Sequence, residues 1–179
     1  MDSVRGHLLI AAPSLLDPNF QRTVILVAEH TDEGALGVVL NRPADATVGE
    51  VVPDLSPVVD EEDNVYTGGP VQPGGVMVLA EFEDPDDAAL PVDGDLGFVA
   101  LEADTEDLAT GRARAFAGHA GWGPGQLDAE LEEEAWFVAP FEREDVFTVD
   151  PDELWSRALM RKGGAYALVA RMPEDPSLN

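Results

Sequence analysis

The segment Gly118–Leu127, GHAGWGPGQL, combines one histidine and one tryptophan with four glycines. A histidine can transfer protons near neutral pH, and an indole offers a flat apolar face to a small ligand. We expect a loop here, between a strand at 112–117 and a helix that starts at Pro124, because glycine permits positive φ and proline suits the first helical turn. Free N–H groups at such a helix start attract anions or carbonyl oxygens. The candidate ligand-binding residues of this segment are His119, Gly121, Trp122 and Gln126.

Two further loops are rich in glycine, proline and side-chain hydrogen-bonding groups. The first is Asn41-Arg42-Pro43 and the second is Gly68-Gly69-Pro70, and each follows the end of a predicted strand. Loops on a rigid scaffold are where binding groups gather. We therefore predict one binding surface built from both loops and from His119–Gln126, which requires the three to lie within about 15 Å of one another. Its further candidate residues are Asn41, Arg42, Gly68, Gly69 and Pro70.

Each of these features also has a structural interpretation. The glycines are expected mainly to permit a tight corner against neighbouring strands. Trp122 is predicted to close the end of the core, with a place in a cleft beside His119 as the alternative. Arg42 is expected to pair with a structural carboxylate, although it could offer a bidentate fork to a carboxylate ligand. The segment lacks the Gly-Lys-Ser/Thr ending of a phosphate-binding loop and the G-x-G-x-x-G spacing, so no nucleotide or other cofactor is predicted.

Catalytic patterns are sparse. The histidines His7, His30 and His119 have no helical spacing, and Glu29 and His30 point to opposite faces of a strand, so we predict no metal site. His30 is expected to be a hydrogen-bonded structural residue. None of the five serines lies in a Gly-x-Ser-x-Gly elbow, which argues against acyl transfer by a serine triad. A hydrolase with His119 or His30 as general base stays open, and it requires a carboxylate behind the histidine.

Composition narrows the class of protein. A chain of 179 residues fits one domain, and the absence of cysteine excludes disulfides and thiolate sites. The chain has 36 acidic residues against 10 basic ones, a formal net charge of −26. Such a surface repels phosphate backbones, so direct nucleic-acid binding is not expected. Neither a signal peptide nor a membrane span is apparent, which predicts a cytoplasmic protein.

Hydrophobic patterning predicts an α+β fold with a curved, mostly antiparallel sheet and three or four helices outside it. The expected strands are 6–12, 22–30, 34–40, 65–67, 75–82, 96–101, 112–117, 135–139 and 165–170. The 22–30 strand is apolar without alternation and should be buried on both faces. Helices are expected from the capping box at Thr47 to before Pro53, at 105–109 with Thr105 as cap, at 124–134 and at 150–162. Residues 83–95 are predicted to be a loop and 172–179 a loose tail.

Several short motifs, in order, resemble the YqgE/AlgH family, also known as UPF0301 or DUF179. They are Asp17-Pro18-Asn19-Phe20, Arg22, Glu29-His30, Gly34-Ala35-Leu36-Gly37, Asn41-Arg42-Pro43, Gly68-Gly69-Pro70-Val71, Ala120-Gly121-Trp122-Gly123 and Gly125-Gln126-Leu127. The resemblance implies one domain over 1–179, a bent sheet approaching a pseudo-barrel, and a cytosolic bacterial protein. It implies no reaction, and some members are labelled transcriptional regulators without an evident DNA-binding motif. Two features depart from the family: His119 stands where an aromatic such as tyrosine is usual, and the acidity is higher.

Together these features favour a non-enzymatic binding or regulatory domain. Its expected partner is an unknown small molecule or protein, with no direct nucleic-acid or membrane contact. The alternative is a small-molecule hydrolase with a histidine general base, and a third hypothesis is a regulator that acts through protein partners.

Overall fold

The computed structural model of the protein describes residues 2–100 and 104–173. Ten strands form one mostly antiparallel sheet, accompanied by five α-helices and four short 3₁₀ helices in the described ranges. The strands are β1 His7–Ala11, β2 Val24–Thr31, β3 Gly34–Val39, β4 Pro43–Thr47, β5 Asn64–Thr67, β6 Val71–Phe82, β7 Leu90–Asp93, β8 Leu96–Phe98, β9 Thr110–Trp122 and β10 Trp136–Pro140. The α-helices are α1 Val48–Val51, α2 Gln126–Glu132, α3 Arg143–Val146, α4 Leu154–Lys162 and α5 Ala165–Val169. The 3₁₀ helices are η1 Pro53–Leu55, η2 Pro85–Asp87, η3 Thr105–Asp107 and η4 Pro151–Glu153.

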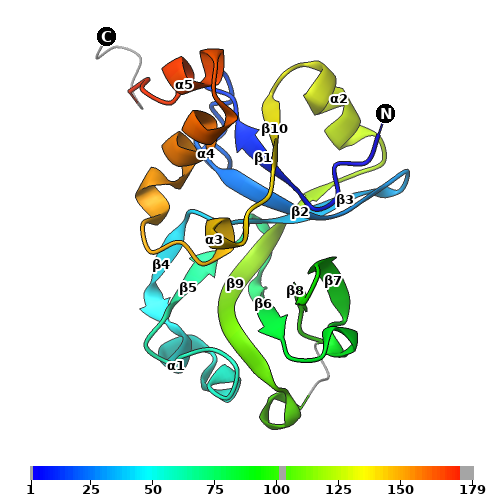
Figure 1. Ribbon diagram of the computed structural model, residues 1–179, viewed down its shortest axis with the longest axis vertical. Helices are drawn as coiled ribbons and strands as arrows, with labels where there is room; N and C mark the ends of the chain where they lie inside the picture. The colour runs from blue at the N-terminus through cyan, green and yellow to red at the C-terminus, as the bar shows by residue number, and fades with distance from the viewer. Residues whose placement is uncertain (1, 101–103, 174–179) are drawn as a thin grey trace.

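Strand β9 joins the two halves of the molecule (Figure 1). Its first part pairs with β6, and its last residues, from Ala120 to Trp122, pair with β3. The sheet order β10-β1-β2-β3-β9-β6-β8-β7 therefore runs through one long bent strand, with β5 and β4 attached as a side branch. β5 pairs with β9 in parallel, and the other strand pairs are antiparallel. The predicted α+β class and bent sheet are confirmed, but the sheet does not close into a barrel.

The β1-β2-β3-β10 half is covered on both faces. Val24, Leu26 and Ala28 of β2 belong to one buried cluster, with Leu154 and Leu159 of α4. The intervening residues Ile25 and Val27 belong to a second cluster, with Leu127 of α2 and the indoles Trp122 and Trp136. Successive side chains of a strand point to opposite faces, so a strand covered on both sides is apolar throughout. The prediction that this strand is buried on both faces is confirmed.

The other half has its own core under α1 and η1. Val48, Val58 and Val59 pack there with Val78 and Phe82 of β6. Thr47 caps α1 as predicted, because its side chain accepts a hydrogen bond from the Glu50 backbone N–H. The helix ends at Val51, before Pro53, as expected.

Several predicted elements or their bounds are wrong. Ala165–Val169 form helix α5 instead of a strand, because a short apolar run fits either structure. Gly163 and Gly164, both with positive φ, separate it from α4. Residues 118–122 continue strand β9 instead of forming a loop, and α2 starts at Gln126 instead of Pro124.

The other corrections concern turns and edges. The expected 83–95 loop contains η2 and β7, and Asp104, not Thr105, caps η3. Pro43 opens β4, a strand that was not predicted, and β4 tolerates proline because it is an edge strand. β8 ends at Phe98, and Leu101 of the expected 96–101 strand lies outside the described residues, as do 174–179 of the expected tail.

Candidate functional site

The predicted glycine loops meet at a crossing of two backbones. The Gly68 N–H donates to the Ala117 carbonyl at 2.8 Å. A Cβ built on Gly69 would lie 2.2 Å from the carbonyl carbon of His119, and one on Gly118 would lie 2.3 Å from the Gly69 oxygen. Real Cβ atoms do not approach backbone so closely, so glycine is required on both sides. This confirms the prediction that the glycines form a tight corner against neighbouring strands.

The Asn41-Arg42-Pro43 loop adjoins the same crossing. The Arg42 carbonyl accepts from the Thr67 N–H at 2.7 Å, and the Gly68 carbonyl accepts from the Val39 N–H at 2.8 Å. Backbone hydrogen bonds thus connect Arg42 to the residue before the 68–70 loop, and Gly68 to the last residue of β3. The crossing positions strands, and its glycines carry no side chain that could contact a ligand.

The later part of the 119–126 segment turns away from this crossing. Trp122 is 7% exposed and lies in the core, where its indole N–H donates to Oε1 of Glu130 at 3.3 Å. Trp136 donates to the same oxygen at 3.1 Å. The expectation that Trp122 closes the core is confirmed. Gly121 and Gln126 are exposed, and the Gln126 side chain accepts from the Gly123 N–H at 3.0 Å.

A shallow pocket of about 260 Å³ adjoins the rim of Trp122. Its other walls come from the β2–β3 hairpin and include Glu29 and Glu33. None of its lining residues belongs to the 41–43 or 68–70 loops. Trp122 and Arg42 therefore border different hollows of the described structure.

The two histidines proposed as general bases have different surroundings. His119 is partly buried, which lowers its pKa, and its ring has no hydrogen bond or ion pair among the described residues. His30 has a 6% exposed side chain whose Nδ1 accepts from the Val4 N–H at 3.0 Å. Its Nε2 lies 3.0 Å from Oδ1 of Asp128, although the geometry is not that of a hydrogen bond. The prediction that His30 is a hydrogen-bonded structural residue is confirmed.

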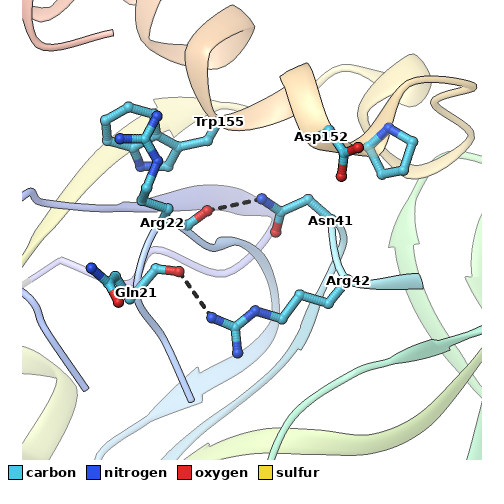
Figure 2. A pocket seen from close by; sticks show the side chains of 7 residues that line it. Gln21, Arg22, Asn41, Arg42, Asp152 and Trp155 are labelled. Atoms are coloured by element: carbon cyan, nitrogen blue, oxygen red, sulfur yellow. Dashed lines mark hydrogen bonds between the residues drawn. The ribbon is translucent and has the colours of Figure 1, made fainter. Parts of the chain in front are cut away.

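A larger hollow lies beside the Asn41-Arg42 loop, and we call it the arginine pocket (Figure 2). Its volume is about 490 Å³, within the range of small-molecule sites. Its lining residues are Gln21, Arg22, Asn41, Arg42, Pro151, Asp152 and Trp155. Asn41 and Arg42 are predicted site residues, and the other five were missed as such. A signal existed for Arg22, which lies in the Asp17–Arg22 motif that carries the family resemblance.

Arg22 is held in an unusual backbone conformation. Its φ is 56°, in the left-handed region that residues with a side chain rarely adopt. The Asn41 side chain donates to the Arg22 carbonyl at 2.9 Å and accepts from the Val24 N–H at 3.0 Å. The guanidinium stacks 4.0 Å above the Trp155 ring and donates through Nη1 to the Met172 carbonyl at 2.9 Å. Arg22 is therefore fixed at both its backbone and its side chain.

The side chain of Arg42 is also held by hydrogen bonds to the backbone. Its Nη1 and Nη2 donate to the carbonyls of Asn19 and Gln21, both at 2.9 Å. The expected structural carboxylate is thus replaced by two carbonyl oxygens in the described structure. Burial lowers the pKa of Arg42, and the nearby charge of Asp17 acts in the opposite direction. A guanidinium nevertheless stays charged at neutral pH.

The charge of the arginine pocket contrasts with that of the chain. Arg112, Arg143 and Arg161 each form an ion pair with at least one carboxylate. No carboxylate of the described residues lies within ion-pairing distance of Arg22 or Arg42, and the same is true of Arg5, Arg114 and Arg157. Of these five arginines, Arg22 and Arg42 border the same pocket. Asp152 is the one acidic residue among the pocket walls. A molecule of net charge −26 therefore keeps two guanidinium groups and one carboxylate at a single hollow.

This open, bent sheet with helices on its outer faces defines an α+β domain of the AlgH-like class. The chain belongs to that family, whose model, DUF179: AlgH-like, matches residues 8–167. UPF0301 proteins of Streptomyces coelicolor and Streptomyces avermitilis are 46% and 45% identical to it, each over 100% of this chain and 97% of the relative.

Solved structures agree with this assignment. The crystal structure of a protein from Corynebacterium diphtheriae has a TM-score of 0.84 and 33% identity, covering 95% of this chain and 93% of that one. The solution structure of the AlgH protein from Pseudomonas aeruginosa, a UPF0301 protein, has a TM-score of 0.74 and 32% identity, covering 97% of both chains. In the described ranges of our protein, every helix falls short of the length and apolarity that crossing a bilayer requires.

Proposed function

We propose that this protein is a cytosolic, non-enzymatic binding domain that takes a small anionic molecule in the arginine pocket and acts as a regulator through protein partners. The observation that carries the proposal is the pair of guanidinium groups, Arg22 and Arg42, without a carboxylate partner among the described residues of a strongly acidic chain. Unpaired arginines are the usual receptors for carboxylate and phosphate groups.

The donors available to a ligand support an anion. Each guanidinium has five N–H groups. Arg42 uses two of them on carbonyl oxygens and Arg22 uses one, so both retain donors. Because carbonyl contacts and the Trp155 ring already orient both side chains, a ligand would order few rotamers on binding. Donors that are already oriented in this way lower the entropy cost of binding, and so favour stable binding of a small anion in the pocket.

The left-handed backbone of Arg22 is the second supporting observation. A residue with a side chain costs of order 1–3 kcal/mol in this region, and such residues gather at functional sites. Here Asn41 holds the conformation, and both residues line the same pocket.

The hydrolase alternative receives no comparable support. Both ring nitrogens of His30 already face protein groups, and His119 has no carboxylate behind it in the described structure. Neither histidine lines the arginine pocket or the hollow beside Trp122. We also propose no direct nucleic-acid contact, because a surface with 36 acids repels phosphates.

A thermal-shift screen of small carboxylates, phosphates and sulfates would test the proposal. Sodium chloride is adjusted to constant ionic strength, because salt alone can stabilise so acidic a chain. The screen is run on the wild type, Arg42→Gln, Arg22→Asn and the matched control Arg5→Gln. Arg5 also donates to two backbone carbonyls but lies outside the pocket, and asparagine tolerates the left-handed region at position 22.

A bound anion at a hundredfold excess over its Kd should stabilise the wild type by about 2.7 kcal/mol. We expect the shift to disappear in Arg42→Gln and Arg22→Asn and to persist in Arg5→Gln. The proposal is wrong if no anion stabilises the wild type, or if the shift survives in both pocket variants.

A further inference from the structure

We infer that the ligand of the arginine pocket is a small amino dicarboxylic acid, whose carboxylates bind the arginines and whose ammonium group binds Asp152. The inference rests on the proposed function and names the ligand class for the same site. It depends on the chemistry of the pocket walls, which differ in charge from one side to the other.

Asp152 supplies the one negative wall. It lies in η4, directly before α4, whereas Gln21 comes from the turn before β2 and Arg42 from the connection between β3 and β4 (Figure 2). Its side chain is exposed, and no hydrogen bond or ion pair is formed by it with the described residues. A carboxylate beside two guanidiniums would weaken the binding of a simple anion unless the ligand also carried a cation. An ammonium group on the ligand turns this repulsion into attraction.

The charge count favours two acid groups for one amine. Two guanidiniums and one carboxylate leave the pocket with one net positive charge. A ligand with two carboxylates and one ammonium has the complementary charge, and each of its groups finds an opposite partner. A simple α-amino acid with one carboxylate would leave one arginine without an acidic group.

The remaining walls indicate a ligand that is polar throughout. Gln21 and Asn41 present amide groups, and the apolar lining residues are only Pro151 and Trp155. Trp155 is 2% exposed, and the guanidinium of Arg22 lies over its ring. A large aliphatic or aromatic substituent would therefore find little apolar surface to bury, which disfavours ligands that carry one.

Asp152 also has a purely structural interpretation. An acidic residue in the first turn of a helix interacts favourably with the helix dipole. Glu153 lies next to it in the same turn, is also exposed, and does not line the pocket. The pair Asp152→Asn and Glu153→Gln therefore removes the same charge from the same turn, inside and outside the pocket.

Isothermal titration with L-glutamate and glutarate, and with L-aspartate and succinate, tests the inference. Within each pair the two molecules carry the same carboxylates and differ by the ammonium group. We expect the wild type to bind an amino acid of one pair about fivefold or more tightly than its partner dicarboxylate. Asp152→Asn should abolish this preference and tighten the dicarboxylate, Glu153→Gln should keep it, and Arg42→Gln should weaken both ligands.

The outcomes separate the two proposals. If glutarate or succinate binds the wild type as tightly as its amino acid, or if Glu153→Gln removes the preference as Asp152→Asn does, the ligand class is wrong while anion binding stands. If none of the four molecules binds but another anion of the thermal-shift screen does, the class is also wrong. If no anion binds the wild type in either experiment, both proposals fail.

Discussion

The side-chain amide of Asn41 holds the backbone of Arg22 in its left-handed conformation. It donates to the Arg22 carbonyl at 2.9 Å and accepts from the Val24 N–H at 3.0 Å, so one amide satisfies the backbone on both sides of Thr23. Asn41 thereby connects the end of β3 to the start of β2. The same contact orients the arginine that stacks on Trp155 at the pocket wall. Stability and the geometry of the arginine pocket consequently depend on one side chain.

Replacement of Asn41 by alanine should destabilise the fold by about 2–4 kcal/mol, because a donor and an acceptor of the backbone each lose their partner. Urea unfolding measures the change in the free energy of unfolding. The control is Asn64→Ala, which removes one exposed hydrogen bond to the Ala44 carbonyl and should cost less than about 1 kcal/mol. Equal unfolding midpoints for the two variants would contradict the role given to Asn41.

The backbone crossing at Gly118 leads to a second prediction. Gly118 and Gly125 have nearly the same φ, 74° and 72°, but a Cβ would lie 2.3 Å from the Gly69 oxygen at the first position and meet nothing within 4 Å at the second. Gly125→Ala should therefore cost only the backbone strain, about 1–2 kcal/mol. Gly118→Ala adds a collision with backbone atoms and should cost at least about 2 kcal/mol more.

The free energy of unfolding, or the soluble yield if Gly118→Ala does not fold, distinguishes these contributions. If the two alanine variants were equally stable, the glycines of the crossing would be explained by φ alone and not by close approach.

Local patterns predicted much of the fold. The 22–30 strand is recognisable because residues buried on both faces leave an uninterrupted apolar run, and α1 because a capping box needs only Thr47 and Glu50. The run at 165–170 was wrongly predicted because a short apolar run suits a strand or a helix. In the fold, helix α5 packs on the core, where the rings of Tyr166 and Phe137 have centroids 5.0 Å apart.

The candidate site was only partly predictable because its walls come from distant parts of the chain. Asn41 and Arg42 could be proposed from their loop, but nothing near them in the sequence indicates that Asp152 and Trp155 lie beside them. The residue types of His119 and Trp122 suggest chemistry in the sequence, but the arginine pocket includes neither of them. In the fold the indole belongs to the core, and the two glycine segments serve the crossing.

The charge of the molecule yields a prediction about nucleic acids. With 36 acids against 10 basic residues, contacts to phosphates would have to overcome repulsion from most of the surface. Fluorescence anisotropy with labelled duplex DNA at physiological salt should give a Kd weaker than about 10⁻⁴ M. Tight binding that weakens steeply as salt is raised would show that basic residues dominate the contact surface after all, and direct DNA regulation would then be restored as a hypothesis.

Glu81 offers a prediction about acid stability. Its carboxylate accepts from Arg112 at 2.8 Å and from Arg143 at 2.9 Å, and mainly the Arg112 hydrogen bonds lower its pKa from 4.5 to about 2. The depressed folded-state pKa means that the stabilisation is present above about pH 4.5 and is lost as the pH falls toward 2. The side chain is 19% exposed, so solvent weakens these contacts and we expect about 1–3 kcal/mol at neutral pH.

Urea unfolding of the wild type and of Glu81→Gln, repeated from pH 7 to pH 2.5, measures this contribution as the difference between the two curves. The difference should be constant down to about pH 5 and shrink below it, since protonation removes the charge that the variant already lacks. Glu144→Gln is the control, because Glu144 also contacts Arg112, at 2.7 Å, but is 74% exposed and should contribute less than about 1 kcal/mol at any pH. A difference that is independent of pH, or equal for the two variants, would mean that Glu81 stabilises this junction of β6, β9 and α3 by packing and neutral hydrogen bonds and not by its charge.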